Sequence, residues 1–407
     1  MPSTLPEGDP APSDGSLPAS ALDGLGQRPF GVYVHVPFCA SRCGYCDFNT
    51  YTASELGGGA SQAEYADTAA REMELAARAL GRDRPRASTV FFGGGTPTLL
   101  PAADLNALLG CVHTMFGLSS DAEVTTEANP ESVNPAYLAE LRAGGFTRIS
   151  FGMQSASSRV LAVLDRHHTV GRAAQAVTEA RDAGFEHINV DLIYGAPGET
   201  DDDWRGSLDA AINSGADHVS AYSLIVEPGT RLATRVARGE LPMTDDDVLA
   251  DRYAIADEAL TSAGFEWYEV SNWARSPGAR SRHNLLYWTD ADWWGVGPGA
   301  HSHVGGVRWW NVKHPRDYAA KLGALQSPAA ARELLSDEDR RVERIMLALR
   351  LRTGLTLAEV DDHARAAAQT AATDGLLDEV ALDVGTAVLT FRGRLLADAV
   401  VRAMVGP

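Results

Sequence analysis

Short β-rich segments alternate with amphipathic segments of helical period between residues 30 and 230, and this alternation constrains the fold more than any other feature. The expected strands cover 31–38, 88–94, 122–129, 147–154, 187–195 and 217–225. The expected helices between them cover 62–80, 101–116, 134–143, 169–183 and 201–214. Repeated strand–helix alternation predicts an α/β fold with a parallel sheet and right-handed crossovers, either an open partial barrel or a doubly wound sheet.

Chemically distinctive residues lie at the carboxyl ends of these predicted strands. Three cysteines come after the first strand, and the string GGGTP at 93–97 comes after the second. Glu127 lies near the end of the third strand, Gln154 ends the fourth, and Asp191 lies late in the fifth. Sites in parallel α/β folds form where the carboxyl ends of the strands meet. We therefore expect these residues to belong to one site.

Composition divides the chain into four regions. Residues 1–27 are rich in Pro, Ser, Gly and Asp and lack a secretory signal, so we expect a disordered tail there. The other regions are a core barrel at 28–240, a connecting region dense in aromatic residues and histidine at 241–330, and a small C-terminal α+β domain at 331–407. In the last region the expected elements are helices near 336–351 and 356–369 and a hairpin around 387–401.

Charge and hydropathy disfavour two classes of protein. The formal net charge is −19, and there is no run of basic residues. Nucleic-acid binding draws much of its affinity from Lys and Arg on phosphates, so an RNA-modifying enzyme is disfavoured. No apolar run approaches the length of a membrane span, so an integral membrane protein is disfavoured as well. We expect a cytoplasmic protein, for which transient contact with a membrane protein stays open.

The cysteines predict an iron–sulfur cluster. Cys39, Cys43 and Cys46 follow a C-x3-C-x2-C spacing, and thiolates are the usual ligands of such clusters. Three thiolates on a four-iron cluster leave one iron open for a small chelating ligand. Structural zinc is nearly always four-coordinate with paired C-x2-C units, so zinc is the weaker interpretation. The remaining Cys111 lies in an apolar helical pattern and is expected to be a small core residue.

The sequence resembles the radical S-adenosylmethionine (radical SAM) superfamily, whose mark is this spacing with an aromatic residue, here Tyr45, before the last cysteine. The resemblance is closer to its HemN-like branch and, within that, to the HemW-type heme chaperones. It rests on strings in the family's order, among them YVHVPFCASRCGYCDF, FFGGGTPTLL, RISFGMQS, NVDLIYGAPGET and RHNLLYW. It implies a partial (β/α)6 radical SAM barrel followed by a small winged-helix-like HemN-type domain.

The resemblance also implies a cofactor site. A 4Fe-4S cluster is expected on Cys39, Cys43 and Cys46, and S-adenosylmethionine is expected to chelate its open iron. The positions that match the family's S-adenosylmethionine contacts are Tyr33, Phe48, Gly94, Gly95, Thr96, Glu127, Gln154, Arg166 and Asp191. Taken without the family match, Arg166 reads as a solvated arginine at a helix end, and the glycines read as a turn after a strand.

Two functions of different class follow from the resemblance. Oxygen-independent coproporphyrinogen III oxidase carries a fourth cysteine two positions after the third, where this chain has Phe48. A heme chaperone that passes heme to acceptor proteins is therefore favoured, and the oxidase, a radical SAM decarboxylase of porphyrin biosynthesis, is the alternative. An electron donor is expected in either case. Whether radical chemistry is part of the function stays open.

The favoured branch carries an H-N-x-x-Y-W motif, which is complete here at 283–288. Its implied heme contacts are His283, Asn284, Tyr287 and Trp288. A neutral imidazole is an ordinary iron ligand, and aromatic side chains suit a porphyrin face. By composition alone, the better interpretation is that Tyr287 and Trp288 are core residues and His283 is a loop histidine with its hydrogen bonds satisfied; His301 is a second candidate for the ligand.

Overall fold

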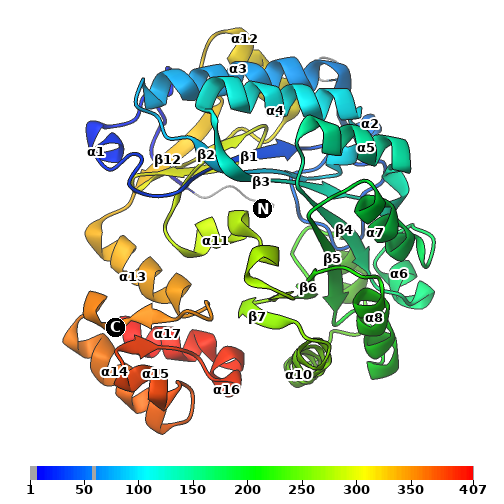
Figure 1. Cartoon of the computed structure of the whole chain (residues 1–407), viewed down its shortest axis with the longest axis vertical. Coiled ribbons are helices and arrows are strands. Elements are labelled where there is room, and N and C mark those ends of the chain that lie inside the picture. The colour runs from blue at the N-terminus through cyan, green and yellow to red at the C-terminus, as the bar shows by residue number, and fades with distance from the viewer. Residues whose placement is uncertain (1–6, 57–60, 407) are drawn as a thin grey trace.

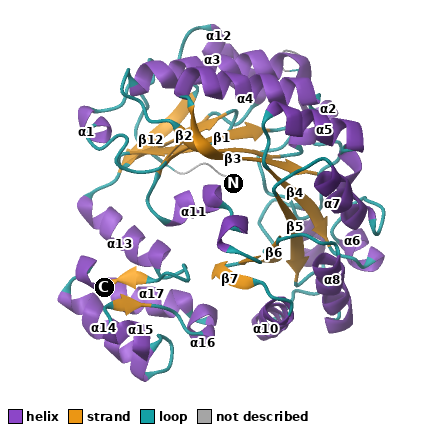
Figure 2. Ribbon diagram, viewed as in Figure 1, coloured by secondary structure: helices purple, strands orange, loops and turns teal. Residues whose placement is uncertain are grey.

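The computed structural model describes residues 7–56 and 61–406, and twelve strands of these residues form one curved sheet. Its centre is six parallel strands in chain order: β1 (Phe30–Val36), β2 (Ala87–Gly94), β3 (Leu118–Ala128), β4 (Arg148–Gln154), β5 (His187–Tyr194) and β6 (His218–Ser223). A doubly wound sheet would reverse its strand order at a switch point. The sequential order and the curvature in Figure 2 therefore make the fold a partial (β/α)6 barrel.

Helices cover the convex face of these strands (Figure 1). They are α3 (Gln62–Leu80), α4 (Ala102–Phe116), α5 (Pro135–Gly144), α7 (Arg172–Asp182) and α8 (Asp201–Asn213). The short α2 (Ala53–Leu56) comes before α3, and the short α6 (Ser158–Val163) comes before α7. Side-chain caps fix several of their starts, as when the Ser61 hydroxyl accepts from the Glu64 amide and Thr200 forms a capping box with Asp203.

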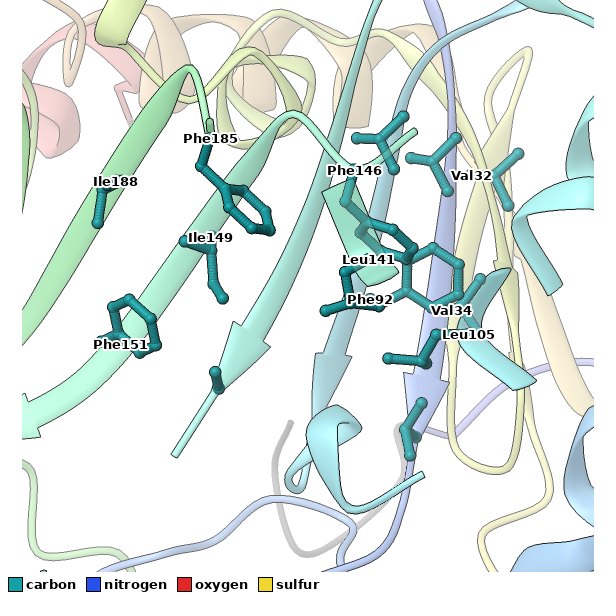
Figure 3. Close-up of a cluster of buried hydrophobic side chains, with 14 of the residues drawn as sticks. Val32, Val34, Phe92, Leu105, Leu141, Phe146, Ile149, Phe151, Phe185 and Ile188 are labelled. Atoms are coloured by element: carbon teal, nitrogen blue, oxygen red, sulfur yellow. The ribbon is translucent and has the colours of Figure 1, made fainter. Parts of the chain in front are cut away.

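The period-two alternation of the strands separates the core from the site. Val32, Val34, Phe92 and Ile149 point from the convex face into the layer beneath the helices, where they are buried (Figure 3). The intervening residues point into the concave interior: a Cβ at Gly31 would meet Leu286 of the next region, and one at Gly93 would meet Glu127. Polar side chains can therefore line the interior without disturbing the apolar core.

The connecting region lengthens the sheet at both ends. After α9 (Arg231–Ala237) and α10 (Asp246–Ser262), β7 (Glu266–Glu269) and β8 (Asn272–Ala274) extend the β6 edge. Beyond β1 come β9 (Asp292–Val296), β10 (His301–Val304), β11 (Val307–Asn311) and β12 (Ala329–Leu334), with α12 (Pro315–Gly323) between the last two. The chain passes from one edge to the other through α11 (Arg282–Trp288), which lies across the concave interior (Figure 1).

The C-terminal unit follows β12 and has an apolar core of its own. Its elements are α13 (Asp337–Ala348), β13 (Leu355–Thr356), α14 (Asp362–Thr373), α15 (Glu379–Asp383), β14 (Thr386–Ala387), α16 (Phe391–Leu395) and α17 (Ala397–Val405). The hairpin expected around 387–401 is wrong, because this stretch forms α16 and α17. Thr390 caps α16, and the buried Val400, Val401 and Met404 of α17 follow a helical period.

The disordered tail expected over residues 1–27 is also wrong for the part that the structure describes. Asp9 forms an antiparallel bridge with Arg332 of the edge strand β12, and the Ser327 amide donates to the Ser13 carbonyl at 2.7 Å. A short helix, α1 (Ala19–Leu22), follows. Backbone hydrogen bonds to a sheet edge need few apolar side chains, so composition alone missed this order. Residues 1–6 lie outside the described part of the chain.

No helix in the described residues is long and apolar enough to cross a membrane.

Truncating the core beneath α4 and α5 should destabilise the barrel. The Phe92 ring is fully buried, and its centroid lies 5.2 Å from that of Phe146. Phe92→Ala should lower the free energy of unfolding by about 3–5 kcal/mol, measured by urea titration with tryptophan fluorescence. Leu325→Ala is the matched control, because that side chain is 85% exposed and should change stability by less than about 0.5 kcal/mol. Equal effects of the two changes would contradict this packing.

Candidate cluster and cofactor site

The loop after β1 carries the three cysteines on a turn that the rest of the barrel holds in place. Phe38 and Tyr51 form a parallel bridge across its base, and the Cys39 amide donates to the Tyr51 carbonyl at 3.0 Å. The Gly44 amide donates to the Leu164 carbonyl at 3.0 Å, which ties the turn to the segment after α6. Cys39, Cys43 and Cys46 are all unpaired and half-buried, so the loop offers three thiols at the carboxyl end of the barrel.

The electrostatics of the loop suit thiols that lose their protons to a metal. Burial raises the pKa of Cys39, and it raises that of Cys46 to about 11, so both are protonated at neutral pH without a metal. The Arg166 guanidinium lies 3.7 Å from the Cys43 sulfur and carries a buried Nε with no hydrogen-bond partner. A cation beside the thiols offsets part of the negative charge that thiolates bring, and thiolates are the form that binds iron.

The thiols of the described loop do not form a site for a single metal ion. No group of three or more His, Cys, Asp or Glu side chains in the described residues could hold a single metal ion. In a four-iron cluster each thiolate binds a different iron, so the sulfurs need not converge on one point. Cys111 lies on α4, where burial raises its pKa and the nearby Glu74 and Asp67 of α3 add to the effect, and the structure does not bring it to this loop. The three loop cysteines therefore fit the predicted cluster.

The glycine segment after β2 runs beside the cysteine loop. The Gly95 amide donates to the Val36 carbonyl at 2.8 Å, and the Thr96 amide donates to the Phe38 carbonyl at 2.7 Å. A Cβ at Gly95 would overlap the Phe38 carbonyl, and Gly94 has φ of +113°, which a side chain would strain. The glycines are thus required for the close approach of the two loops.

Two carboxylates face the interior below these loops. Glu127 accepts a hydrogen bond from the Gly94 backbone amide at 3.0 Å. Asp191 accepts from the Ser150 hydroxyl at 2.6 Å and from the Asn189 side-chain amide at 2.7 Å. Burial raises the pKa of both, and with the charge of Asp191 it raises that of Glu127 to about 8. Both residues are only partly buried, so their side chains can accept hydrogen bonds from the hydroxyl groups of a ligand.

Gln154 and Arg166 converge at Gly152. A Cβ at Gly152 would lie 2.8 Å from the Gln154 amide nitrogen and 3.0 Å from the Arg166 guanidinium, which donates to the Gly152 carbonyl. Gln154 has φ of +66°, a strained conformation for a residue other than glycine, and such strain is concentrated at functional sites. The structure thus brings together the cofactor contacts expected on β2 to β5.

Tyr33 lies inside the barrel on β1, whereas Phe48 lies near the surface of the site. The Tyr33 hydroxyl is 3.0 Å from the His35 Nδ1, and the His35 Nε2 is 2.9 Å from the Asn49 carbonyl, so Tyr33 is linked to the cysteine loop. Phe48 is half exposed on a cavity of about 370 Å³ that Cys46 also lines. His35 and Asn49 were not among the residues expected from the sequence, although the polar residue inside the apolar string YVHVPF was a signal for His35.

The complete motif on α11 faces the same interior. The His283 ring stacks on Phe91 with centroids 5.1 Å apart and lies 6.3 Å from the Tyr33 ring. Burial raises the pKa of the Tyr287 hydroxyl, and the charge of Glu127 adds to this effect. His283 and Tyr287 of the expected heme site and the expected S-adenosylmethionine residues therefore face one interior, although they lie far apart in the sequence.

Hydrogen bonds occupy both ring nitrogens of His283. Its Nδ1 is 2.7 Å from the Thr89 hydroxyl and its Nε2 is 2.9 Å from the Tyr287 hydroxyl, while burial lowers its pKa to about 3. An iron atom at Nε2 would have to displace Tyr287. Asn284 and Trp288 are half-buried, and Trp288 hydrogen-bonds to the Glu269 carboxylate. His301 differs from His283, because its Nε2 is buried without a hydrogen-bond partner.

The fold and this site define a radical SAM protein, and the family model described as the Radical SAM superfamily matches residues 33–211. The chain is 55% identical to the heme chaperone HemW of Mycobacterium tuberculosis over 93% of its own length and 95% of that protein. It is 32% identical to HemW of Bacillus subtilis over 92% of its length and 99% of that protein. The chain therefore belongs to the HemW family.

A solved structure shares the fold. Coproporphyrinogen III oxidase (HemN) from Escherichia coli superposes with a TM-score of 0.81 over 96% of this chain and 94% of its own. At 22% sequence identity this likeness supports the α/β barrel with its C-terminal unit and says nothing of activity.

Replacing any one of Cys39, Cys43 and Cys46 by Ser should abolish the absorption spectrum of the 4Fe-4S cluster and most of the bound iron, because two thiolates hold such a cluster poorly. Iron content and visible absorption after anaerobic reconstitution measure the effect. Cys111→Ser is the matched control and should keep the cluster. Loss of iron in that control would contradict the three-cysteine assignment.

Glu127 should make the stability of the protein without cofactors depend on pH. Its pKa is about 8 when folded, against an ordinary value of 4.5, so between these values the folded chain holds a proton that the unfolded chain has lost. Wild-type stability should therefore fall as pH rises from about 4.5 to 8 by more than that of Glu127→Gln. Thermal unfolding at pH 5 and pH 8.5 measures the difference, with the exposed Glu140→Gln as control. A constant gap between wild type and Glu127→Gln would contradict the raised pKa.

Proposed function

We propose that this protein is a heme chaperone that binds heme and passes it to acceptor proteins. The observation that carries the proposal is its 55% identity, over 93% of the chain, to a mycobacterial heme chaperone. The work of the protein would take place in the cytoplasm. The acceptor proteins and the electron donor are its macromolecular partners in this account.

The cluster loop and the barrel interior would hold two cofactors. Cys39, Cys43 and Cys46 would bind three irons of a 4Fe-4S cluster, and the fourth would take the amine and carboxylate of S-adenosylmethionine. Gly94, Gly95 and Thr96 border the methionine end of that ligand in this account. The remaining contacts would come from Tyr33, Phe48, Glu127, Gln154, Arg166 and Asp191. Such a cluster supplies single electrons to the bound sulfonium.

The residues of the chain itself do three things in this arrangement. The Arg166 guanidinium would balance the negative charge of the Cys43 thiolate. Its hydrogen bond to the Gly152 carbonyl holds it in position. Glu127 and Asp191 would accept hydrogen bonds from hydroxyl groups of the ligand. The Gly94 amide orients Glu127, and the Ser150 hydroxyl orients Asp191. The Phe91 and His283 rings, stacked with centroids 5.1 Å apart, occupy part of the interior and keep water from that part.

The oxidase is the weaker alternative for two reasons. Its solved representative shares the fold at 22% identity, which carries no activity to this chain. The loop after Cys46 reads Asp47–Phe48 and therefore lacks the fourth cysteine expected of the oxidase. One anaerobic sample with its cluster reconstituted distinguishes the two: a chaperone binds heme and leaves coproporphyrinogen unconsumed, whereas an oxidase consumes it.

Heme is proposed to bind at the motif on α11, with His283 as the iron ligand and Asn284, Tyr287 and Trp288 around it. His283 is neutral at physiological pH, which is the protonation state that iron requires. Binding at Nε2 replaces its 2.9 Å contact with the Tyr287 hydroxyl. Because His283 is only 1% exposed, heme entry is expected to shift α11 from its place in the barrel.

His283→Ala should weaken heme binding about tenfold or more and leave the cluster spectrum unchanged, because the ligand is lost and the cysteine loop is not touched. Heme titration followed by visible absorption, and transfer of the bound heme to apo-myoglobin, measure the effect. His301→Ala is the matched control and should bind heme as the wild type does. Heme binding that depends on His301 and not on His283 would contradict the assigned site, and absence of heme binding by the wild type would contradict the function.

A further inference from the structure

Thr50 lies four positions after the third cysteine, and its hydroxyl has no hydrogen-bond partner in the described protein. The residue is only 2% exposed, so water does not satisfy it either. An unsatisfied buried hydroxyl costs about 1–3 kcal/mol, whereas valine, which has the same shape, would cost nothing of this kind. A threonine at this position therefore points to a partner that the hydroxyl acquires in another state of the protein.

The backbone places Thr50 against Cys39. The Tyr51 amide donates to the Pro37 carbonyl at 2.7 Å, and the Cys39 amide donates to the Tyr51 carbonyl at 3.0 Å. These two bonds align the segment containing Thr50 with the segment containing Cys39. The Arg42 guanidinium donates to the Thr50 carbonyl and holds the segment from its other side.

A neutral thiol is a weak hydrogen-bond acceptor, and a thiolate is a much stronger one. We propose that Thr50 donates a hydrogen bond to the Cys39 thiolate when that thiolate binds the cluster, and that this bond raises the reduction potential of the cluster. The inference rests on the cluster assigned under the proposed function and adds a residue that neither the spacing of the cysteines nor the expected cofactor contacts include.

The direction of the effect follows from charge. One electron that enters the cluster makes it more negative, and part of that charge lies on the cysteine sulfurs. A donor on a sulfur therefore stabilises the reduced cluster more than the oxidised one, and hydrogen bonds to the sulfurs are among the factors that set cluster potentials. Removing the donor should make the reduced cluster about tenfold rarer at a given ambient potential, which corresponds to 59 mV for a one-electron couple.

Thr50→Val tests the proposal in the full chain, reconstituted anaerobically without S-adenosylmethionine or heme. A redox titration followed by electron paramagnetic resonance of the reduced cluster should give a midpoint potential about 59 mV more negative than that of the wild type, which is the tenfold change for a one-electron couple. Thr50→Ser keeps the hydroxyl and should restore the wild-type potential. Thr52→Val is the matched control on the same loop, because the exposed Thr52 hydroxyl bonds to Glu55 and should leave the potential unchanged.

An unchanged midpoint in Thr50→Val, or an equal shift in Thr50→Ser and Thr50→Val, would overturn the proposal. If Thr50→Val binds no cluster, Thr50→Ala is titrated in its place with the same expected shift. Loss of the cluster from both would overturn the proposal too, because the hydroxyl would then be needed to hold the cluster and not to set its potential. A wild-type chain that forms no cluster would instead contradict the proposed function.

Discussion

The close approach of the loops after β1 and β2 is the contact on which the site depends. Gly95 lies against the Phe38 carbonyl where a side chain would not fit, and amides of the glycine segment bond to carbonyls at 36 and 38. This contact requires β1 and β2 to be parallel neighbours, because only then do their carboxyl ends, and the loops that follow them, lie together. It brings the thiols of one loop beside the backbone amides and the glutamate that the other loop orients.

The period of two along each strand provides the second constraint. Outward residues such as Val34 and Phe92 build the apolar layer under the helices, and inward residues such as Tyr33 and Glu127 line the interior. The chain can therefore keep several ionisable groups inside without breaking its core. The cost is a raised pKa for the buried carboxylates, which the Gly94 amide and the Ser150 hydroxyl partly offset.

Sequence patterns predicted the central barrel well and its surroundings less well. All six expected strands and their helices occur within a few residues of the expected bounds, because each is encoded by local periodicity and by nearby caps. The place of α11 depends on distant partners, since its His283 amide donates to Glu123, which is 160 positions away. The helices at 391–405 were missed because the alternating letters at 387–391 resembled a strand, and the ordered segment at 7–27 was missed because it is held by backbone bonds. His35 and Thr50 escaped notice because their importance lies in neighbours that only the folded chain supplies.

The central claim is that three cysteines hold a cluster whose remaining iron is open to S-adenosylmethionine. Electron paramagnetic resonance of the reduced cluster, recorded before and after S-adenosylmethionine is added to the reconstituted wild-type protein, tests it most directly. A ligand that binds an iron changes the electronic structure of the cluster, so the account predicts a changed spectrum. A spectrum that S-adenosylmethionine leaves unaltered, in a sample with full cluster content, would contradict it.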